Sequence, residues 1–599
     1  MRPSIKPVIG AAFCVAIAMA GQTADALDVR LETTAGDDLK QRLTDASRLI
    51  AAQAEGTTNP QDIMAIARSE YRRLIGTLYG RGHYSGVVHI YIDGREAASI
   101  PPLSVPAQIN DVRITVTPGR AFTFGREQVA PLNAGTELPE GFARGEPARS
   151  GLVGDAGRAA VSGWRRDGHA KARISGQKIT ADHPNRSLDV ALAVDPGPEV
   201  IFGQMITTPE TNVRPSRIRA IAHLPTGEKF DPDTVEQIGR RLRRTGTFRS
   251  VTVEEAETLG PDNSLDITAT LIEEKPRRFG FGGEVSSFEG ATISTYFIHR
   301  NLFRGAERLR LDAEVSGIGG DSGGIDYSLS ARITRPATLW PDTSAYILGS
   351  AELEDEPSYY SQTAKASIGL ESIISEELEA SVSAGYRFSD VRDDIGSRRF
   401  RHLTLSAGAE WDRRDDALNP GKGFYLAADA MPFIGLAGSA TGAQIKADGR
   451  AYRRLGGDDG RIVLAGRLQF GSIVGAPLAE TPPDLLFYSG GGGTVRGHPY
   501  QSLNVDLGGG AETGGRAFVG TSAEVRAGIT EKIGLVGFVD AGWIDAASLP
   551  SGSSQMHAGA GLGLRYNTGI GPIRLDVAAP IAGDTGNGVQ IYVGIGQSF

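Results

Sequence analysis

Cysteine and long apolar runs are nearly absent from the chain. Its one cysteine among 599 residues is Cys14, close to the N-terminus. A chain with no other thiol forms no intramolecular disulfide and offers no thiolate metal site. No run of about 18 or more apolar residues follows the N-terminal segment, so the sequence predicts no transmembrane helix. If this protein contacts a bilayer, we expect strands to make the contact.

The motifs of common enzyme classes are also missing. The nine histidines are scattered, without an HExxH or another compact ligand spacing. GGDSGG, at 319–324, contains the string around the nucleophile of chymotrypsin-like proteases. It lies between two alternating segments, which favours a hairpin loop for Ser322 over a triad. A formal net charge of −9 argues against general nucleic-acid binding. We therefore expect no enzyme, no metal or cofactor site and no nucleic-acid partner.

The N-terminus has the pattern of a secretory signal peptide. Arg2 and Lys6 precede an apolar run, Val8–Ala20, that is shorter than the ~20 residues of a membrane-spanning helix. Small residues follow at the spacing of a cleavage site, after residue 20 or residue 26. A buried helix is the alternative, but it gives no reason for the flanking charges or the small residues. Residues 1–26 therefore predict an exported protein.

Residues 28–276 mix helical and strand patterns, and three stretches within them look alike. Each stretch is the end of a helical pattern, then a glycine, then a strand pattern. Glycine is the usual residue at a helix C-cap, where the backbone needs a positive φ. Each unit is thus predicted to fold as strand, helix, helix, strand, strand. The three capping glycines are Gly82, Gly168 and Gly246.

This order resembles the POTRA module, a β-α-α-β-β domain of the periplasm. In family members its strand edges receive extended client chains. Three such units would span 27–106, 107–197 and 198–276. An unrelated α+β domain repeated by chance is the alternative. The arginines between residues 240 and 244 are typical of a partner surface or of the solvated face of a helix.

From residue 277 the pattern changes to short segments in which apolar and polar residues alternate. The segments 309–316 and 461–471 are clear examples. A soluble sandwich alternates as well, but here about 16 segments continue to residue 599 with no helical region between them. Apolar residues would face lipid and polar residues a wet lumen. The predicted fold class is α+β periplasmic POTRA repeats followed by a transmembrane antiparallel β-barrel, 277–599, of about 16 strands.

The first and last predicted strands, about 278–288 and 589–599, are rich in glycine. Glycine weakens a strand, and a poorly paired edge is a template for an incoming strand. We therefore predict a weak seam between them. Residue 599 is expected to share a face with Ile591, Val593 and Ile595, so that the last strand closes the barrel and ends on an aromatic ring. The seam residues are Gly280, Gly282, Gly283, Gly594, Gly596 and Phe599.

A glycine-rich loop, GGGGTVRGHPYQSL at 490–503, lies between segments that end near Val474 and begin near Phe518. It is no phosphate site, because no Lys-Ser/Thr pair follows it. The stretch resembles the VRG(Y/F) loop of the BamA/TamA superfamily of outer-membrane assembly factors, which folds back inside the barrel. Stretches at 411–424, 521–529, 537–544 and 571–581 resemble the same superfamily. The motif residues are Val495, Arg496, Gly497 and His498, with His498 where the family usually has Tyr or Phe.

Two carboxylates are predicted to meet this loop inside the barrel. Strand parity places Glu524 and Asp540 on the polar faces of adjacent strands. The resemblance implies that Arg496 reaches them, and a guanidinium suits the task because it is a planar fork that stays charged. The pair would pin the loop to the wall. The alternative is an arginine exposed on a mobile loop.

Three POTRA-like units point to TamA within the superfamily, since BamA usually has five and two-partner-secretion transporters two. The resemblance implies a bacterial outer-membrane protein, with its N-terminal domains in the periplasm, that inserts or assembles β-barrel proteins such as autotransporters. The implied partners are the outer-membrane bilayer, unfolded outer-membrane protein clients and a TamB-like, inner-membrane-anchored protein. A two-partner-secretion-type polypeptide transporter and a passive outer-membrane channel are the alternatives.

Overall fold

The computed structural model describes residues 27–101, 104–286, 290–320, 323–457, 460–569, 571–586 and 588–599. The predicted signal peptide, 1–26, and the hairpin position of Ser322 lie outside these residues. The described chain divides into two compact units. The first extends to Ile201 and includes Glu228–Pro232, and the second holds Phe202–Gly227 and Asp233–Phe599. Among the described residues, no helix is long and apolar enough to cross a bilayer.

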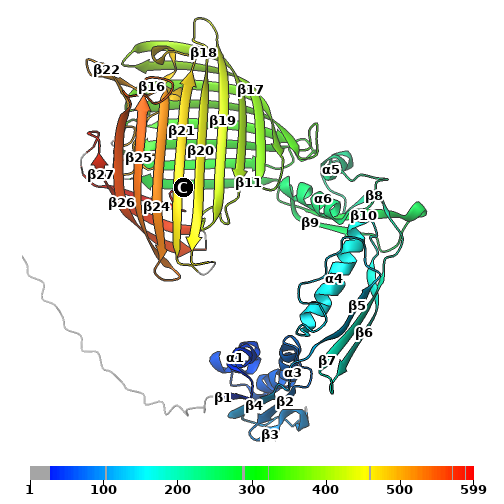
Figure 1. Cartoon of the computed structure of the whole chain (residues 1–599). Helices are drawn as coiled ribbons and strands as arrows, with labels where there is room; N and C mark the ends of the chain where they lie inside the picture. The colour runs from blue at the N-terminus through cyan, green and yellow to red at the C-terminus, as the bar shows by residue number, and fades with distance from the viewer. Residues whose placement is uncertain are drawn as a thin grey trace, which may run out of the picture. The chain divides into compact units, whose positions relative to one another are not determined.

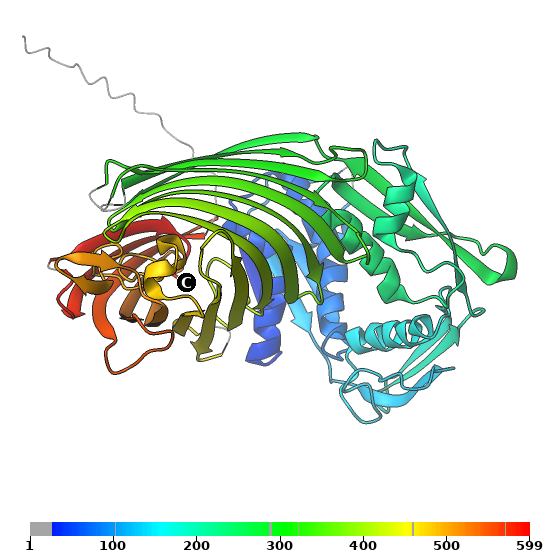
Figure 2. The same ribbon diagram turned by 90° about the horizontal axis from the view of Figure 1, so that it is seen from above.

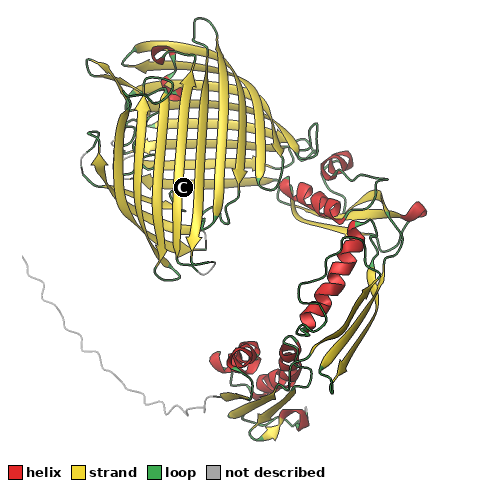
Figure 3. Cartoon of the chain, in the orientation of Figure 1, coloured by secondary structure: helices red, strands yellow, loops and turns green. Residues whose placement is uncertain are grey.

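The first domain packs three α-helices on a four-stranded sheet, as can be followed in Figures 1 and 3. Asn59 caps the longest helix by accepting a hydrogen bond from the backbone of Gln61, and proline follows at the first helical position. The strand order is β1-β4-β2-β3, with β1 parallel to β4. The predicted limit at residue 106 therefore falls before the central strand β4. The elements are β1 (Asp28–Thr33), α1 (Asp37–Ala46), α2 (Arg48–Ala54), α3 (Pro60–Tyr79), β2 (Val87–Ile92), β3 (Arg95–Glu96) and β4 (Asp111–Thr117).

The second domain has one helix where the sequence predicted two. Residues 131–149 form no helix, because prolines and positive-φ glycines interrupt them: Gly135, Gly141 and Gly145 have φ of 80°, 83° and 86°. The sheet order is β5-β7-β6, so β6 is an edge strand. The elements are β5 (Thr123–Ala130), α4 (Ser150–Arg166), β6 (Arg173–Asp182) and β7 (Ser187–Asp195).

The third domain follows the predicted order of strand, helix, helix, strand, strand. Its apolar helix residues, among them Ile218, Ile238 and Leu242, pack on the sheet. The strand order is β8-β10-β9. The elements are β8 (Ile201–Thr208), α5 (Pro215–Ala222), α6 (Pro232–Arg244), β9 (Phe248–Glu255) and β10 (Ser264–Glu273).

The glycines that suggested a repeat have the backbone conformation expected of C-caps. Their φ angles are 83° at Gly82, 80° at Gly168 and 64° at Gly246, which confirms that prediction. The first two also mark equivalent junctions. The carbonyl of Gly82 accepts a hydrogen bond from the backbone of Phe122 at 2.9 Å, and that of Gly168 accepts one from Val200 at 2.9 Å. The chain thus leaves each domain beside the cap of its own helix.

The remaining chain forms a 16-stranded antiparallel sheet in sequential order, which confirms the predicted strand number (Figures 1 and 2). Its helical turns are short and lie in the loop after β21 (Figure 3). The strands are β11 (Arg277–Ser286), β12 (Gly290–His299), β13 (Arg308–Ile318), β14 (Asp326–Arg335), β15 (Thr343–Glu356), β16 (Tyr359–Ile373), β17 (Leu378–Asp393), β18 (Gly396–Asp412), β19 (Gly423–Gly435), β20 (Gly442–Leu455), β21 (Ile462–Val474), β24 (Ala517–Gly528), β25 (Ile533–Asp545), β26 (Gln555–Thr568), β27 (Gly571–Ala582) and β28 (Gln590–Ile595).

Side chains alternate across this sheet as the sequence predicted. Leu468, Leu562 and Val593 are 59%, 74% and 50% exposed on the outer face, whereas Arg387 and Glu524 on the inner face are 3% and 2% exposed. A continuous outer surface of aliphatic residues is too large for a monomer in water. Buried ionic groups on the inside are typical of a polar lumen.

The two end strands, β11 and β28, lie beside each other without forming a ladder. No backbone pairing joins them in the described part of the chain, so the sheet is not closed. The expectation that the last strand closes the barrel is thus not met here. β28 has six residues and ends at Ile595, because the chain turns at Gly596, whose φ is 90°.

Candidate functional site

The loop between β21 and β24 folds into the space that the sheet encloses (Figure 2). It begins after Val474 and ends before Ala517, as the sequence predicted. Its apolar residues Leu485, Phe487 and Leu503 form a buried cluster with wall residues, among them Ile473, Phe518 and Ile544. The loop contains a small hairpin of β22 (Val505–Gly508) and β23 (Ala511–Thr513). It is therefore a packed part of the barrel interior.

Arg496 is 2% exposed and contacts three carboxylates. Its Nε and Nη2 donate to the two oxygens of Asp540 at 2.7 and 3.0 Å, a bidentate arrangement. Its Nη1 lies 2.9 Å from Glu524 and 3.2 Å from Asp576. The guanidinium also stacks 3.5 Å from the ring centre of Phe538. The structure thus brings Arg496 together with both carboxylates named from the sequence and adds a third.

Two wall arginines extend this cluster to the end of the chain. Arg526 lies 2.8 Å from Glu524 and donates to the backbone oxygen of Phe599 at 3.1 Å. Arg565 pairs with Asp576 and donates to Gln597 at 2.8 Å. Three arginines and three carboxylates balance in charge, which lets all six be buried together. We call them the arginine–carboxylate cluster: Arg496, Glu524, Arg526, Asp540, Arg565 and Asp576.

The residues beside Arg496 fit a narrow space. Gly497 has a φ of 99°, and a Cβ there would lie 2.8 Å from the backbone of Ala579. Its amide donates to the hydroxyl of Tyr592, in β28, at 3.1 Å. Val495 is fully buried. A side chain at position 497 would therefore push the loop away from the last strands.

His498 keeps a ring contact although it replaces an aromatic residue of the family. Its ring centre lies 4.2 Å from that of His557 in β26. Nε2 is 2.9 Å from the carbonyl of Ala558, an acceptor only, so Nε2 carries a proton and donates. Nδ1 lies 2.8 Å from the hydroxyl of Thr585, in the connection between β27 and β28. His498 thus fastens the loop to the last hairpin.

Two glycines in the wall make room for the loop. A Cβ on Gly542 would lie 2.4 Å from the hydroxyl of Ser489, and one on Gly559 would lie 1.9 Å from the carbonyl of Arg496. These glycines lie in β25 and β26, the strands against which the loop packs. In the sequence, these two positions could have been found only from strand parity, which places a glycine on the inner face of each strand.

The loop has a second attachment on another part of the wall. Asp484 pairs with Arg387 of β17, and these side chains are 5% and 4% exposed. Thr363 of β16 donates to Asp484 at 3.3 Å, and Gln444 of β20 donates to the carbonyl of Leu485 at 2.6 Å. The loop therefore reaches from β16 and β17 to β25, β26 and β27. Sequence reasoning missed this pair.

The seam residues lie where the sequence placed them, with two differences, at Gly596 and Phe599. Gly280, Gly282 and Gly283 are in β11, and a Cβ on Gly280 would lie 2.2 Å from the ring of Tyr296. Gly594 is in β28, and Gly596 follows the strand. Phe599 packs in a buried cluster with Tyr452 and Ala465. The prediction that it shares the outer face of Ile591 is wrong, because the turn at Gly596 sends it inward.

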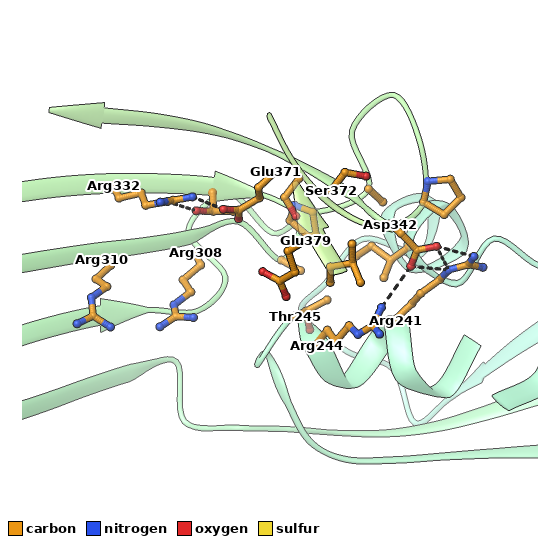
Figure 4. A pocket seen from close by; sticks show the side chains of 18 residues that line it. Arg241, Arg244, Thr245, Arg308, Arg310, Arg332, Asp342, Glu371, Ser372 and Glu379 are labelled. Carbon is orange, nitrogen blue, oxygen red and sulfur yellow. Dashed lines mark hydrogen bonds and ion pairs between the residues drawn. The ribbon is translucent and has the colours of Figure 1, made fainter. Parts of the chain in front are cut away.

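The arginines of α6 bind the barrel part of their own unit. Figure 4 shows Arg241 and Arg244 directed at Asp342, in the connection between β14 and β15, at 2.8 and 3.5 Å. Arg240 lies 3.5 Å from Glu376, in the next connection on this side. Arg217 of α5 donates to the carbonyl of Pro336. These arginines therefore pair within their own unit, while the side chains of Arg240 and Arg244 stay about a third exposed.

A groove accompanies the free edge of β6 in the second domain. It has a volume of about 770 Å³ and lies between β6 and α4. Gly154 and Gly157 of α4 leave it open, and Ile174 and Ile179 of β6 line it. Ile179 is 46% exposed. An unpaired edge beside an apolar groove has the form of a β-augmentation site.

Three α/β domains followed by a 16-stranded sheet with an inward arginine loop define a POTRA–barrel protein. Residues 301–599 match the model of the Omp85 superfamily domain. BamA from Haemophilus ducreyi lacking POTRA domains 1-3 has a similar structure: the TM-score is 0.61 at 17% identity, over 78% of this chain and 99% of that one. CdiB from Acinetobacter baumannii gives 0.49 at 13% identity, over 79% and 88%.

The chain belongs to the Omp85 superfamily. The resemblance to BamA/TamA-type proteins is confirmed by this match and by the fold shared with BamA. The narrower likeness to TamA stays a prediction.

Proposed function

We propose that this protein inserts or assembles β-barrel proteins in the bacterial outer membrane. The observation that carries the proposal is a loop braced at one end against the strands next to an unpaired sheet end. Gly497 reaches Tyr592 of β28, and the arginine–carboxylate cluster reaches Gln597 and Phe599. A braced wall next to an open edge can offer that edge to a client strand without unravelling.

The client strand would pair at the seam between β11 and β28. Both strands have a side without a ladder in the described residues, and unpaired backbone groups favour strand addition. In hydrocarbon an unpaired edge is costly, so an incoming strand that satisfies its donors and acceptors is stabilised there. The glycines of β11 weaken this strand, which makes it easier for a client strand to separate β11 from β28.

The α/β domains would act before this step as a periplasmic array that receives unfolded clients. The groove along β6 supports a role in capture, since it offers backbone pairing on one side and apolar contacts on the other. Residues 1–26 would direct export. A TamB-like, inner-membrane-anchored protein is the partner proposed for the TamA-type function, with autotransporters among the clients.

The alternatives differ in what crosses the lumen. A passive channel needs an open path, whereas here a loop attached to β17 at Asp484 and to β25 at Arg496 occupies the interior. A two-partner-secretion-type transporter would move a polypeptide through that space and require the loop to leave it. A loop that stays in the lumen during activity would favour assembly at the seam over both alternatives.

A disulfide across the seam tests the proposal. Since Cys14 is the only native cysteine, two introduced cysteines have few competing thiols with which to form a disulfide. One cysteine in β11 and one in β28, at a separation that a disulfide can bridge, should block insertion of a client barrel when oxidised and release it on reduction. The matched control joins two paired wall positions, Thr295→Cys and Ala313→Cys. Full insertion by the oxidised seam variant would contradict the mechanism.

Depletion in cells separates assembly from conduction. Loss of the protein should lower the amounts of particular outer-membrane proteins while the permeability to small solutes stays unchanged. A fall in solute uptake with a normal complement of outer-membrane proteins would favour the passive channel.

A further inference from the structure

A second groove lies on the outer face of the 16-stranded sheet, beside the start of α5. It has a volume of about 720 Å³ and a lining that is mostly aliphatic. Its wall residues come from β14 to β18, and Phe303, Arg214 and Glu307 form its end at the third domain. The exposed Ile347, Ile368 and Leu405 are each about 60% accessible. This groove is separate from the loop site inside the barrel.

The strand register explains why the surface is hollow. Ile347 pairs with Ile368, which pairs with Ala384, and Ala384 pairs with Leu405. Ala384 thus leaves a gap between two large side chains in this row. The next row toward the third domain has a similar gap, because Ala345 lies between Arg335 and Leu370. The two rows are ~7 Å apart along the strands. Ala384 is in β17 and Ala345 in β15, with Ile368 and Leu370 of β16 between them, and all four residues line the same groove, which we call the trough.

The end of this trough carries an excess of positive charge. Arg335 is the last residue of β14, and in the described chain its guanidinium has no hydrogen bond or ion pair. Arg214 precedes α5 and lies 3.9 Å from Glu307. The neighbouring Arg217 is buried, and its Nε lacks a partner among the described residues. Arg335, Arg214 and one carboxylate, Glu307, thus line the end of the apolar trough, and Arg217 lies buried close by.

We propose that this groove binds an anionic glycerophospholipid of the leaflet next to the α/β domains. One acyl chain lies along the trough over Ala384 and Ala345, and the phosphate contacts Arg335 and Arg214. Arginine suits a phosphate because its donors match the oxygen geometry. The aliphatic trough fits an apolar chain, and the arginines at its end fit one anionic group. The inference rests on the proposed membrane placement of the barrel.

Such a lipid would contact the third domain and the barrel wall at once. Arg214 belongs to the segment before α5, and Arg335 ends a barrel strand. A bound phosphate would therefore join two parts of the same unit where like charges now face each other. The lipid would stabilise this junction.

Native mass spectrometry of the full-length protein tests the site. Detergent-purified protein is titrated with dioleoyl phosphatidylglycerol and, separately, with the zwitterionic dioleoyl phosphatidylcholine. We expect saturable binding of one phosphatidylglycerol. Arg335→Ala should weaken it about tenfold, close to 1.4 kcal/mol. Ala384→Leu, which fills the trough without changing charge, should weaken it as well. The control is Arg461→Ala, on an exposed barrel connection outside the groove.

The outcomes separate the possible occupants. Equal binding of both lipids, or unchanged phosphatidylglycerol binding in Arg335→Ala and Ala384→Leu, would overturn the proposal. Displacement of the lipid by inorganic phosphate alone would also overturn it, since the trough would then contribute nothing. Lipid binding and seam cross-linking are measured in separate experiments. Loss of the lipid site would therefore leave the assembly proposal standing, and failure of the cross-linking test would leave the lipid site standing.

Discussion

A segment of the inward loop, residues 484–496, is held at its two ends by reversed versions of the same ion pair. At residue 496 the loop supplies the arginine and the wall the carboxylates, whereas at residue 484 the loop supplies the carboxylate and the wall the arginine. Both attachments are buried. They differ in the number of partners: Arg496 has three carboxylates, and Arg387 pairs with Asp484 alone among the ion pairs of the described residues.

The difference indicates which end of the loop is the fixed one. A buried ion pair is stabilising only when the remaining donors and acceptors are satisfied. The arginine–carboxylate cluster comes closer to this condition, with bidentate geometry and links to the last residues of the chain. Among its described atoms Glu524 Oε1 and Arg565 Nη2 lack a hydrogen bond, whereas all three guanidinium nitrogens of Arg387 lack one. The Asp484 attachment lies against β16 and β17, far along the sheet from the seam. We infer that the Arg496 end supports the working edge and that the Asp484 end sets the path of the loop.

Removal of the loop arginine should have the largest effect. Arg496→Ala leaves Asp540 without a cation and takes one partner each from Glu524 and Asp576. Breaking a buried pair in this way costs about 3–5 kcal/mol. We expect the loop to become sensitive to protease and client insertion to fall steeply. Arg496→Lys should restore only part of both, because an ammonium cannot make the bidentate contact. Full activity with a protected loop in Arg496→Ala would contradict the brace.

Neutralising the wall carboxylates should give nearly the same defect. In Glu524→Gln with Asp540→Asn, Arg496 keeps Asp576 as its one charged partner and Arg526 loses Glu524, so we expect destabilisation similar to that of Arg496→Ala. The destabilisation is measured by thermal unfolding in detergent and by protease cutting of the loop. Combining these changes with Arg496→Ala should add little, since all three residues act in one cluster. Additive losses would show that the carboxylates act elsewhere.

Loss of the second attachment should have a moderate effect. In Asp484→Asn the neutral amide can still lie against Arg387 and accept from Thr363, so we expect a smaller loss than in Arg496→Ala, about 1.5–3 kcal/mol. We expect new protease cuts near 484 and largely retained client insertion. Glu480→Gln, an exposed change in the same part of the loop, is the control. A defect as large as that of Arg496→Ala would mean that both ends support the seam.

The contrast between these ends also shows how far sequence reasoning reached. Arg496 could be found because its motif is local, and Glu524 and Asp540 followed from strand parity. Asp576 and Arg565 have the same parity signal, but nothing local says which of many inward residues meets the loop. Asp484 and Arg387 are further from prediction, because their contact depends on where the loop crosses the interior.

The number and order of the strands were easier to predict from the sequence than the conformation of the last residues, 596–599. Alternation repeats in every strand, so the number of strands and the long loop after Val474 could be predicted. The turn at Gly596 depends on one glycine, and the burial of Phe599 depends on partners such as Tyr452 and Arg526 that lie far away in sequence. The helix before Gly168 was predicted, but the second helix expected in this domain does not form, because prolines and positive-φ glycines interrupt residues 131–149.

Substitution of His498 should have the smallest effect, and it tests whether the arginine or the histidine holds this part of the loop. His498→Phe restores the family's aromatic residue and keeps a ring next to His557. Thr585 keeps its contact with His557 at 3.0 Å, so only the carbonyl of Ala558 loses its donor. An unsatisfied buried acceptor costs about 1–3 kcal/mol, and the larger apolar ring offsets part of this. We therefore expect destabilisation of about 1 kcal/mol, a protected loop and near-normal insertion. Thr585→Val, which removes the hydroxyl shared by both histidines, should cost more than His498→Phe. If His498→Phe instead frees the loop as fully as Arg496→Ala does, the hydrogen bonds of His498 rather than the arginine hold this end of the loop.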